Sequence, residues 1–166
     1  SNLISSKIFG HSAFDQILLN RKIDIHLGRD RLRLDYLKVN EIISKDYVRL
    51  VPEHNVSDMV RILADSNVSE GYVIDPKGKL ISKVSLPLLL KTRNKKNFLN
   101  DKIFRKYLYL NTADTVLQAI DKVKDFVGET IPVIDKKGFI KGTISESDLF
   151  NSLLLAEKER NEEELS

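Results

Sequence analysis

The sequence contains no cysteine and only three histidines. The absence of cysteine excludes disulfide bonds, thiolate nucleophiles and zinc–thiolate sites. His11, His26 and His54 are far apart and do not have the spacing of a metal-ligand pair, so we interpret each as a surface or capping residue. The sequence also lacks a Ser-His or Cys-His constellation and a glycine-rich phosphate loop. We therefore do not expect an enzyme, and no required cofactor or metal is predicted.

Long apolar runs are missing as well. No stretch approaches the roughly 20 apolar residues of a membrane-spanning helix, so direct membrane insertion of this segment is not expected. The 27 Lys and Arg residues are balanced by 24 Asp and Glu residues, and the net charge of +3 is evenly spread, which argues against nucleic acid as a partner. With 166 residues and a hydrophobic fraction of 42%, the chain can bury a globular core.

The main positive feature is an internal repeat. Residues 72–78 (YVIDPKG) align without gaps with residues 132–138 (PVIDKKG), an offset of 60 residues. The same offset pairs apolar or capping residues over a longer span: Val56 with Val116, Val60 with Ile120, Leu63 with Val123, Val84 with Ile144, Ser85 with Ser145 and Leu89 with Leu149. A duplicated structural unit is therefore predicted.

Each copy has the pattern strand, helix, strand, turn, strand, helix. Residues 47–51 and 107–110 are rich in β-formers and predict the first strands, while Asn55 and Thr115 are expected to cap amphipathic helices. The Asp-x-x-Gly turns at residues 75–78 and 135–138 predict hairpins, and Ser85 and Ser145 are placed to cap the closing helices.

These patterns predict an α+β fold, similar to α/β, in which two β-α-β-β-α repeats pack sheet to sheet as a pseudo-symmetric pair. The expected boundaries are an N-terminal linker with a helical segment (1–38), repeat 1 (39–97), repeat 2 (98–155) and a charged tail (156–166). The tail is interpreted as either a helix extension or a disordered segment.

The string Gly142-Thr143-Ile144-Ser145-Glu146-Ser147-Asp148-Leu149 gives the repeats a specific resemblance. Together with the Asp-x-x-Gly hairpins, it resembles the CBS domain pair, or Bateman module, over residues from about 39 to 154. The resemblance implies a regulatory module that binds an adenine nucleotide (ATP, ADP or AMP) between its repeats.

The resemblance also implies positions for the ligand. Asp148 is expected to accept hydrogen bonds from the ribose hydroxyls, and Ser145 and Ser147, with the free N–H groups at the start of the helix, suit a phosphate. The adenine is expected to lie against the opposite repeat, near Leu50, Val68 and Ser69. The alternative is that Ser145 and Asp148 form only a capping box and bind nothing.

The first repeat departs from this motif. Ser82 stands where the motif has Gly, and Leu88, preceded by Pro87, stands where it has Asp. An apolar side chain cannot hold ribose hydroxyls, so one nucleotide site per chain is expected.

Residues 14–24, followed by Gly28 and Arg29, resemble the linker that joins the membrane helices of CLC-family chloride channels and transporters to their CBS pair. This resemblance implies a location at the cytoplasmic face of the cell membrane, association with the membrane-embedded part of the same protein, and a homodimer formed through the CBS repeats. The alternative function is a structural dimerisation module of a membrane transporter that binds no nucleotide.

The basic run at residues 91–96 (KTRNKK) lies between the repeats. It is interpreted as a solvated loop, with contact to nucleotide phosphates or anionic lipid headgroups as the alternative.

Overall fold

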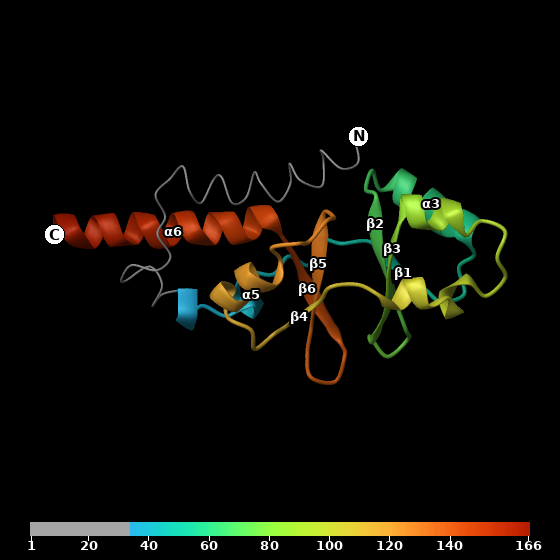
Figure 1. The fold of residues 1–166 in the computed structure, drawn as a ribbon, viewed down its shortest axis with the longest axis horizontal. Helices are drawn as coiled ribbons and strands as arrows, with labels where there is room; N and C mark the ends of the chain where they lie inside the picture. The colour runs from blue at the N-terminus through green and yellow to red at the C-terminus, as the bar shows by residue number, and fades with distance from the viewer. Residues whose placement is uncertain (1–33) are drawn as a thin grey trace.

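The computed structural model describes residues 34–166. Two three-stranded sheets lie side by side near the centre of the molecule, and the helices lie on their outer sides (Figure 1). The long last helix projects away from the second sheet and gives the molecule its elongated shape (Figure 1).

The first repeat has the predicted order of elements. It consists of β1 (Arg49–Leu50), α3 (Val56–Asp65), β2 (Glu70–Ile74), β3 (Leu80–Ser85) and α4 (Leu86–Lys91). β2 is the central strand, parallel to β1 and antiparallel to β3. Asn55 caps α3 as predicted, and the apolar positions at helical spacing, Val56, Met59 and Leu63, are buried.

The second repeat has the same topology after two short 3-10 helices, η2 (Phe98–Asn100) and η3 (Lys102–Arg105). It consists of β4 (Leu110–Asn111), α5 (Val116–Lys122), β5 (Thr130–Ile134), β6 (Ile140–Ser145) and α6 (Glu146–Leu165). The strand registers agree at an offset of 60: Glu70 lies opposite Ser85, and Thr130 opposite Ser145. Both central strands also carry the same register shift, at residues 73/74 and 133/134. The predicted duplication is confirmed.

The first strand of each repeat is shorter than predicted. β1 contains only Arg49 and Leu50, and β4 only Leu110 and Asn111. The chain before Arg49 leaves the sheet because it crosses toward the other repeat, and a single further bond, from the Tyr72 amide to the Val48 carbonyl (3.0 Å), extends the pairing. The predictions of strands at residues 47–51 and 107–110 were therefore wrong in extent.

Hydrogen bonds between the two hairpins join the repeats. Leu80 N donates to Gly138 O (3.0 Å), and Ile140 N donates to Gly78 O (3.2 Å). Gly78 and Gly138 have φ values of 96° and 87°, which only glycine adopts readily, so the predicted turns are confirmed. Each repeat has its own core, and a third apolar cluster that contains Tyr72 lies at the junction. The predicted α+β pair, packed sheet to sheet, is the observed fold.

The charged tail is helical. α6 contains 20 residues and ends at Leu165, so the charged residues 157–164 extend the closing helix. The other end of the described chain contains η1 (Val39–Glu41), which precedes the first strand and contacts the second repeat.

Candidate functional site

Asp148 lies in the first turn of α6 and forms a capping box with Ser145. The Ser145 amide donates to Asp148 Oδ2 (2.8 Å), and the Asp148 amide donates to Ser145 Oγ (3.1 Å). The second carboxylate oxygen, Oδ1, accepts no hydrogen bond from residues 34–166. Asp148 is half-buried and Ser147 is exposed. The cap therefore occupies one carboxylate oxygen and leaves the other available to a ligand.

The segment before repeat 1 crosses the second repeat close to this position. Ser44 and Thr143 exchange two backbone hydrogen bonds of 2.8 Å, so the segment pairs with β6 two residues before Ser145. A Cβ atom on Gly142 would lie 2.6 Å from the Ser44 carbonyl oxygen and 2.9 Å from Ile43 Cβ. Gly142 is thus required for this close crossing, and Ser44 is a neighbour of the candidate site that the sequence interpretation missed. The glycine at position 142 was the feature of the sequence that could have indicated this close approach of another segment.

The first repeat differs at the position equivalent to Gly142. Ser82, the counterpart of Gly142, is buried, and its hydroxyl donates to the carbonyl of Phe104 (2.6 Å) in the segment before repeat 2. In repeat 1 a side-chain hydrogen bond from Ser82 thus holds the crossing segment, whereas repeat 2 uses the two backbone hydrogen bonds between Ser44 and Thr143. Leu88, the counterpart of Asp148, packs against the core of repeat 1. The first repeat therefore has no carboxylate where the second has Asp148.

The three residues predicted to lie near the adenine, Leu50, Val68 and Ser69, differ in position and burial. Ser69 lies at this end of the sheets, because its hydroxyl donates to Glu129 Oε1 (2.6 Å), next to the residue that pairs with Ser145. Val68 is half-buried and packs against the core of repeat 1. Leu50 is 0% exposed, because it fills the core of repeat 1 beneath Gly71, and its place near the adenine stays a prediction.

A buried charged cluster at the same end connects the two repeats. Lys83 Nζ lies 3.0 Å from Glu70 Oε2 and donates to the Thr130 carbonyl (2.6 Å), while the Thr130 amide donates to Glu70 Oε2 (3.1 Å). The Lys83 and Glu70 side chains are only 11% and 10% exposed. Lys83 also lies over the ring of Phe126, 4.8 Å from its centroid. A cation and an anion of repeat 1 thus hold the first residue of β5.

Burial dominates the electrostatics of this cluster. Desolvation lowers the pKa of Lys83, and the neighbouring Glu70 carboxylate opposes that change. Burial also raises the pKa of the Tyr72 hydroxyl, which hydrogen-bonds to Thr130 Oγ1. The sequence interpretation missed this cluster, because its members are separated by up to 60 residues and match no motif.

The other predicted features lie away from Asp148. The basic run at residues 91–96 is exposed except for Thr92, and its Lys95 and Lys96 line a cavity of about 770 Å³ around the start of α3. Ser145 and Asp148 are not among the residues that line this cavity. Residues 14–29, which carried the resemblance to chloride channels, fall outside the described part of the chain. From residue 34 onward, no helix is long and apolar enough to span a bilayer.

Comparisons with known proteins support the CBS resemblance. Residues 102–155 match the model of the CBS domain family. The chain is 25% identical over 117 residues to the uncharacterized protein MJ0188 of Methanocaldococcus jannaschii, a match that covers 70% of this chain and 44% of that protein. The chain thus spans less than half the length of this relative.

Solved structures share the fold. CbpB in complex with c-di-AMP superposes with a TM-score of 0.66 at 16% identity, covering 81% of this chain and 95% of CbpB. CBSX2 from Arabidopsis thaliana, solved with AMP, gives a TM-score of 0.58 at 19% identity and covers 73% of this chain and 98% of CBSX2. The CBS domain pair of MJ0100, solved with 5′-methylthioadenosine and S-adenosyl-L-methionine, gives 0.55 at 20% identity, with coverages of 69% and 97%.

Residues 102–155 thus match the CBS domain family, and the two equivalent three-stranded sheets give the whole chain a fold consistent with a CBS pair. None of the relatives named above is described as a chloride channel.

Proposed function

We propose that this CBS pair is a non-catalytic regulatory module that binds an adenosine-containing ligand at the start of α6. The observation that carries the proposal is the Asp148 carboxylate, whose Oδ1 accepts no hydrogen bond from residues 34–166 although Oδ2 caps the helix. A ribose diol presents two adjacent O–H donors, and a half-buried carboxylate binds them with charge-assisted hydrogen bonds.

The surroundings suit the rest of such a ligand. The first turn of α6 presents N–H groups and the positive end of the helix dipole, and the Ser147 hydroxyl is exposed beside it. Three of the solved structures that share this fold, CBSX2, CbpB and the MJ0100 domain pair, contain AMP, c-di-AMP or S-adenosyl-L-methionine, which supports this ligand class.

Regulation follows from where the ligand would lie. Ser44 from the segment before repeat 1, the end of β6, and Ser69 from repeat 1 converge at this end of the sheets. A ligand that contacts all three shifts the packing of the repeats to the extent that it binds one arrangement more tightly than another.

The test is a thermal-shift titration with ATP, ADP, AMP and 2′-deoxy-AMP. A ligand at about 100 times its dissociation constant adds roughly 2.7 kcal/mol of stability. We expect AMP to raise Tm more than 2′-deoxy-AMP, and Asp148→Asn to remove the AMP shift while its amide oxygen keeps the cap.

Gln118→Ala is the matched control, because Gln118 Oε1 accepts the Thr115 amide (2.9 Å) in the equivalent capping box of α5. It should lower Tm as a cap substitution does and leave the AMP shift intact. An AMP shift that survives Asp148→Asn, or the absence of any shift with all four nucleotides, would contradict the proposal.

We propose that the module also forms a homodimer, and light scattering on the purified chain tests this point. A dimer without any nucleotide response would favour the alternative function, a structural dimerisation module of a membrane transporter. The connection to a chloride channel or exchanger at the cytoplasmic face of the membrane stays a prediction based on residues 14–29.

A further inference from the structure

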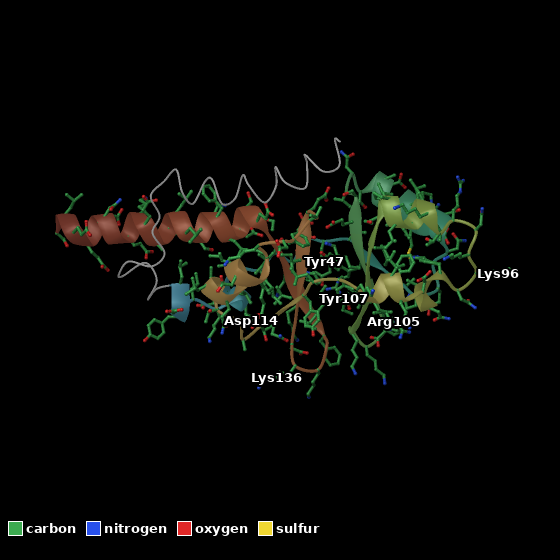
Figure 2. The ribbon with its side chains drawn as sticks, in the orientation of Figure 1. Tyr47, Lys96, Arg105, Tyr107, Asp114 and Lys136 are labelled. Atoms are coloured by element: carbon green, nitrogen blue, oxygen red, sulfur yellow. The ribbon has the colours of Figure 1, made fainter. Side chains whose placement is uncertain are left out.

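A cavity of about 770 Å³ lies around the start of α3, where β1 ends and β3 begins. Four basic side chains line it: Arg93, Lys95, Lys96 and Arg105. Glu53 is the one acidic residue among the lining residues. Lys96 and Arg105 both lie in the half of the molecule that contains α3 (Figure 2). The cavity is therefore a strongly cationic feature of a chain whose net charge is only +3.

Three of these cations have no anionic partner in the described chain. Lys95 Nζ pairs with Asp101 Oδ2 (3.0 Å), but Arg93, Lys96 and Arg105 form no ion pair with any residue from 34 to 166. His54 also lines the cavity, and its Nδ1 accepts a hydrogen bond from the Val51 amide (3.3 Å). The cavity thus offers several donors and little negative charge.

The first turn of α3 contributes backbone donors to the same cavity. Asn55 Oδ1 accepts the Asp58 amide (2.8 Å), whereas the amides of Val56 and Ser57 have no acceptor among residues 34–166. Val56 and Ser57 both line the cavity. Their N–H groups lie at the positive end of the α3 dipole, which favours an anion.

In repeat 2 the equivalent helix start, that of α5, is covered by residues 37–39. There the amide of Val116, the counterpart of Val56, donates to the carbonyl of Leu37 (2.8 Å). The amide of Val39 also donates to the Asp114 carbonyl (2.9 Å), which fixes residues 37–39 against the start of α5. The counterparts of residues 37–39 at the offset of 60 are residues 97–99, which line the cavity without forming these bonds.

The two repeats differ in whether the first amide of the helix has a hydrogen-bond acceptor. In repeat 2 the Leu37 carbonyl accepts a hydrogen bond from the helix amide, whereas in repeat 1 the Val56 amide has no acceptor among residues 34–166, and Val56 lines the cavity together with the cations. Apolar side chains, Ile81 and Leu99, line the same cavity and suit the non-phosphate part of an organic ligand.

We propose that this cavity is a second ligand site, separate from the Asp148 site, and that it binds a phosphate-bearing molecule. Phosphate oxygens accept hydrogen bonds from Arg93 and Arg105 and from the Val56 and Ser57 amides, and Lys96 adds charge.

The test is isothermal titration calorimetry with tripolyphosphate, which contains no nucleoside. Binding should weaken roughly tenfold or more in Arg93→Gln/Arg105→Gln, because the phosphate oxygens lose two charged hydrogen-bond donors. Both arginines are exposed, so this variant should keep the parental Tm; Lys96→Gln is a second, milder variant with the same expected direction.

Lys136→Gln/Lys137→Gln is the charge-matched control. These exposed lysines lie in the β5–β6 turn, and Figure 2 shows Lys136 at its tip, away from α3. The control should bind tripolyphosphate as the parent does. Equal weakening in both double variants, or no binding by the parent, would overturn the proposal. Asp148→Asn should leave tripolyphosphate binding unchanged, so the two sites can fail independently.

A flotation assay distinguishes the two sources of a phosphate group. Vesicles of equal parts phosphatidylcholine and phosphatidylglycerol are mixed with the parent and with Arg93→Gln/Arg105→Gln. Tripolyphosphate binding without flotation identifies a free phosphorylated molecule, and flotation that the arginine variant loses identifies a lipid headgroup. Flotation that the arginine variant retains, together with unchanged tripolyphosphate binding, would contradict the site.

Discussion

The buried Lys83–Glu70 pair permits a quantitative test of what holds the two repeats together. Removal of one partner from a buried ion pair costs about 3 to 5 kcal/mol, because the other charge stays buried without compensation. Lys83→Met should reach this range, since the Glu70 side chain is only 10% exposed and the Thr130 carbonyl also loses its donor. With a urea slope of roughly 2 kcal/mol per M, the unfolding midpoint should fall by about 2 M.

The second variant in this test separates the charge effect from packing. In Lys83→Met/Glu70→Gln the buried charge is gone, while the side-chain amide oxygen introduced by the second substitution can still accept the Thr130 amide. We expect this double variant to recover most of the lost stability, to within about 1 kcal/mol of the parent.

The assay is urea unfolding followed by circular dichroism, with all four members of the double-mutant cycle measured in one buffer. A Lys83→Met variant that loses less than about 1 kcal/mol would refute the reasoning. A double variant that is no more stable than Lys83→Met would also refute it, because the loss would then come from packing rather than from an unpaired charge.

Three further predictions concern single residues. Gly142→Ala places a Cβ 2.6 Å from the Ser44 carbonyl oxygen, so two backbone hydrogen bonds should break and urea unfolding should show a loss of roughly 2 kcal/mol. Ser82→Ala removes the 2.6 Å bond to the Phe104 carbonyl and should cost about 1 to 3 kcal/mol in the same assay, and an unchanged midpoint would contradict this account. Burial raises the pKa of Tyr72, so its stabilising contribution is complete below about pH 10, where the unfolded tyrosine keeps its proton, and is lost as the pH rises further. Between about pH 9 and pH 11 the parent should therefore lose more Tm than Tyr72→Phe, and equal losses would show that this tyrosine is not responsible.

Local signals in the sequence were sufficient to predict the repeats. The capping residues Asn55, Thr115 and Ser145 were identified correctly, because a cap involves residues only three positions apart. The turn glycines were also identified, because their positive φ is a local requirement. Because the repeats align at an offset of 60 residues, a cap or turn identified in one repeat indicated its counterpart in the other.

Contacts between the repeats could not be predicted in the same way. The crossing of Ser44 over Gly142 and the Lys83–Glu70–Thr130 cluster join residues that are distant in sequence, and no short motif encodes them. The complete burial of Leu50 could not be predicted for a related reason. Its position in β1 is compatible with a core or a cleft, and only the packed structure shows that its side chain is fully buried.

The two repeats have diverged at opposite ends of one framework. Repeat 2 has Gly142 in β6 and Asp148 in the first turn of α6, and the Val116 amide at the start of α5 donates to the Leu37 carbonyl. Repeat 1 lacks the carboxylate but keeps an open, cationic cavity that Arg105 helps to line.

Each proposed site also uses the segment that precedes the opposite repeat. Ser44 precedes repeat 1 and pairs with β6, while Arg105 follows Phe104, which bonds to Ser82 in β3. A ligand at either site therefore fixes a crossing segment against the other repeat, so the two ligands should affect each other's affinity.

Thermodynamic linkage requires that tripolyphosphate change the Kd of AMP by the same factor by which AMP changes the Kd of tripolyphosphate. Calorimetric titrations of each ligand with the other at saturation measure both factors. Two factors of one would show that the crossing segments do not connect the sites.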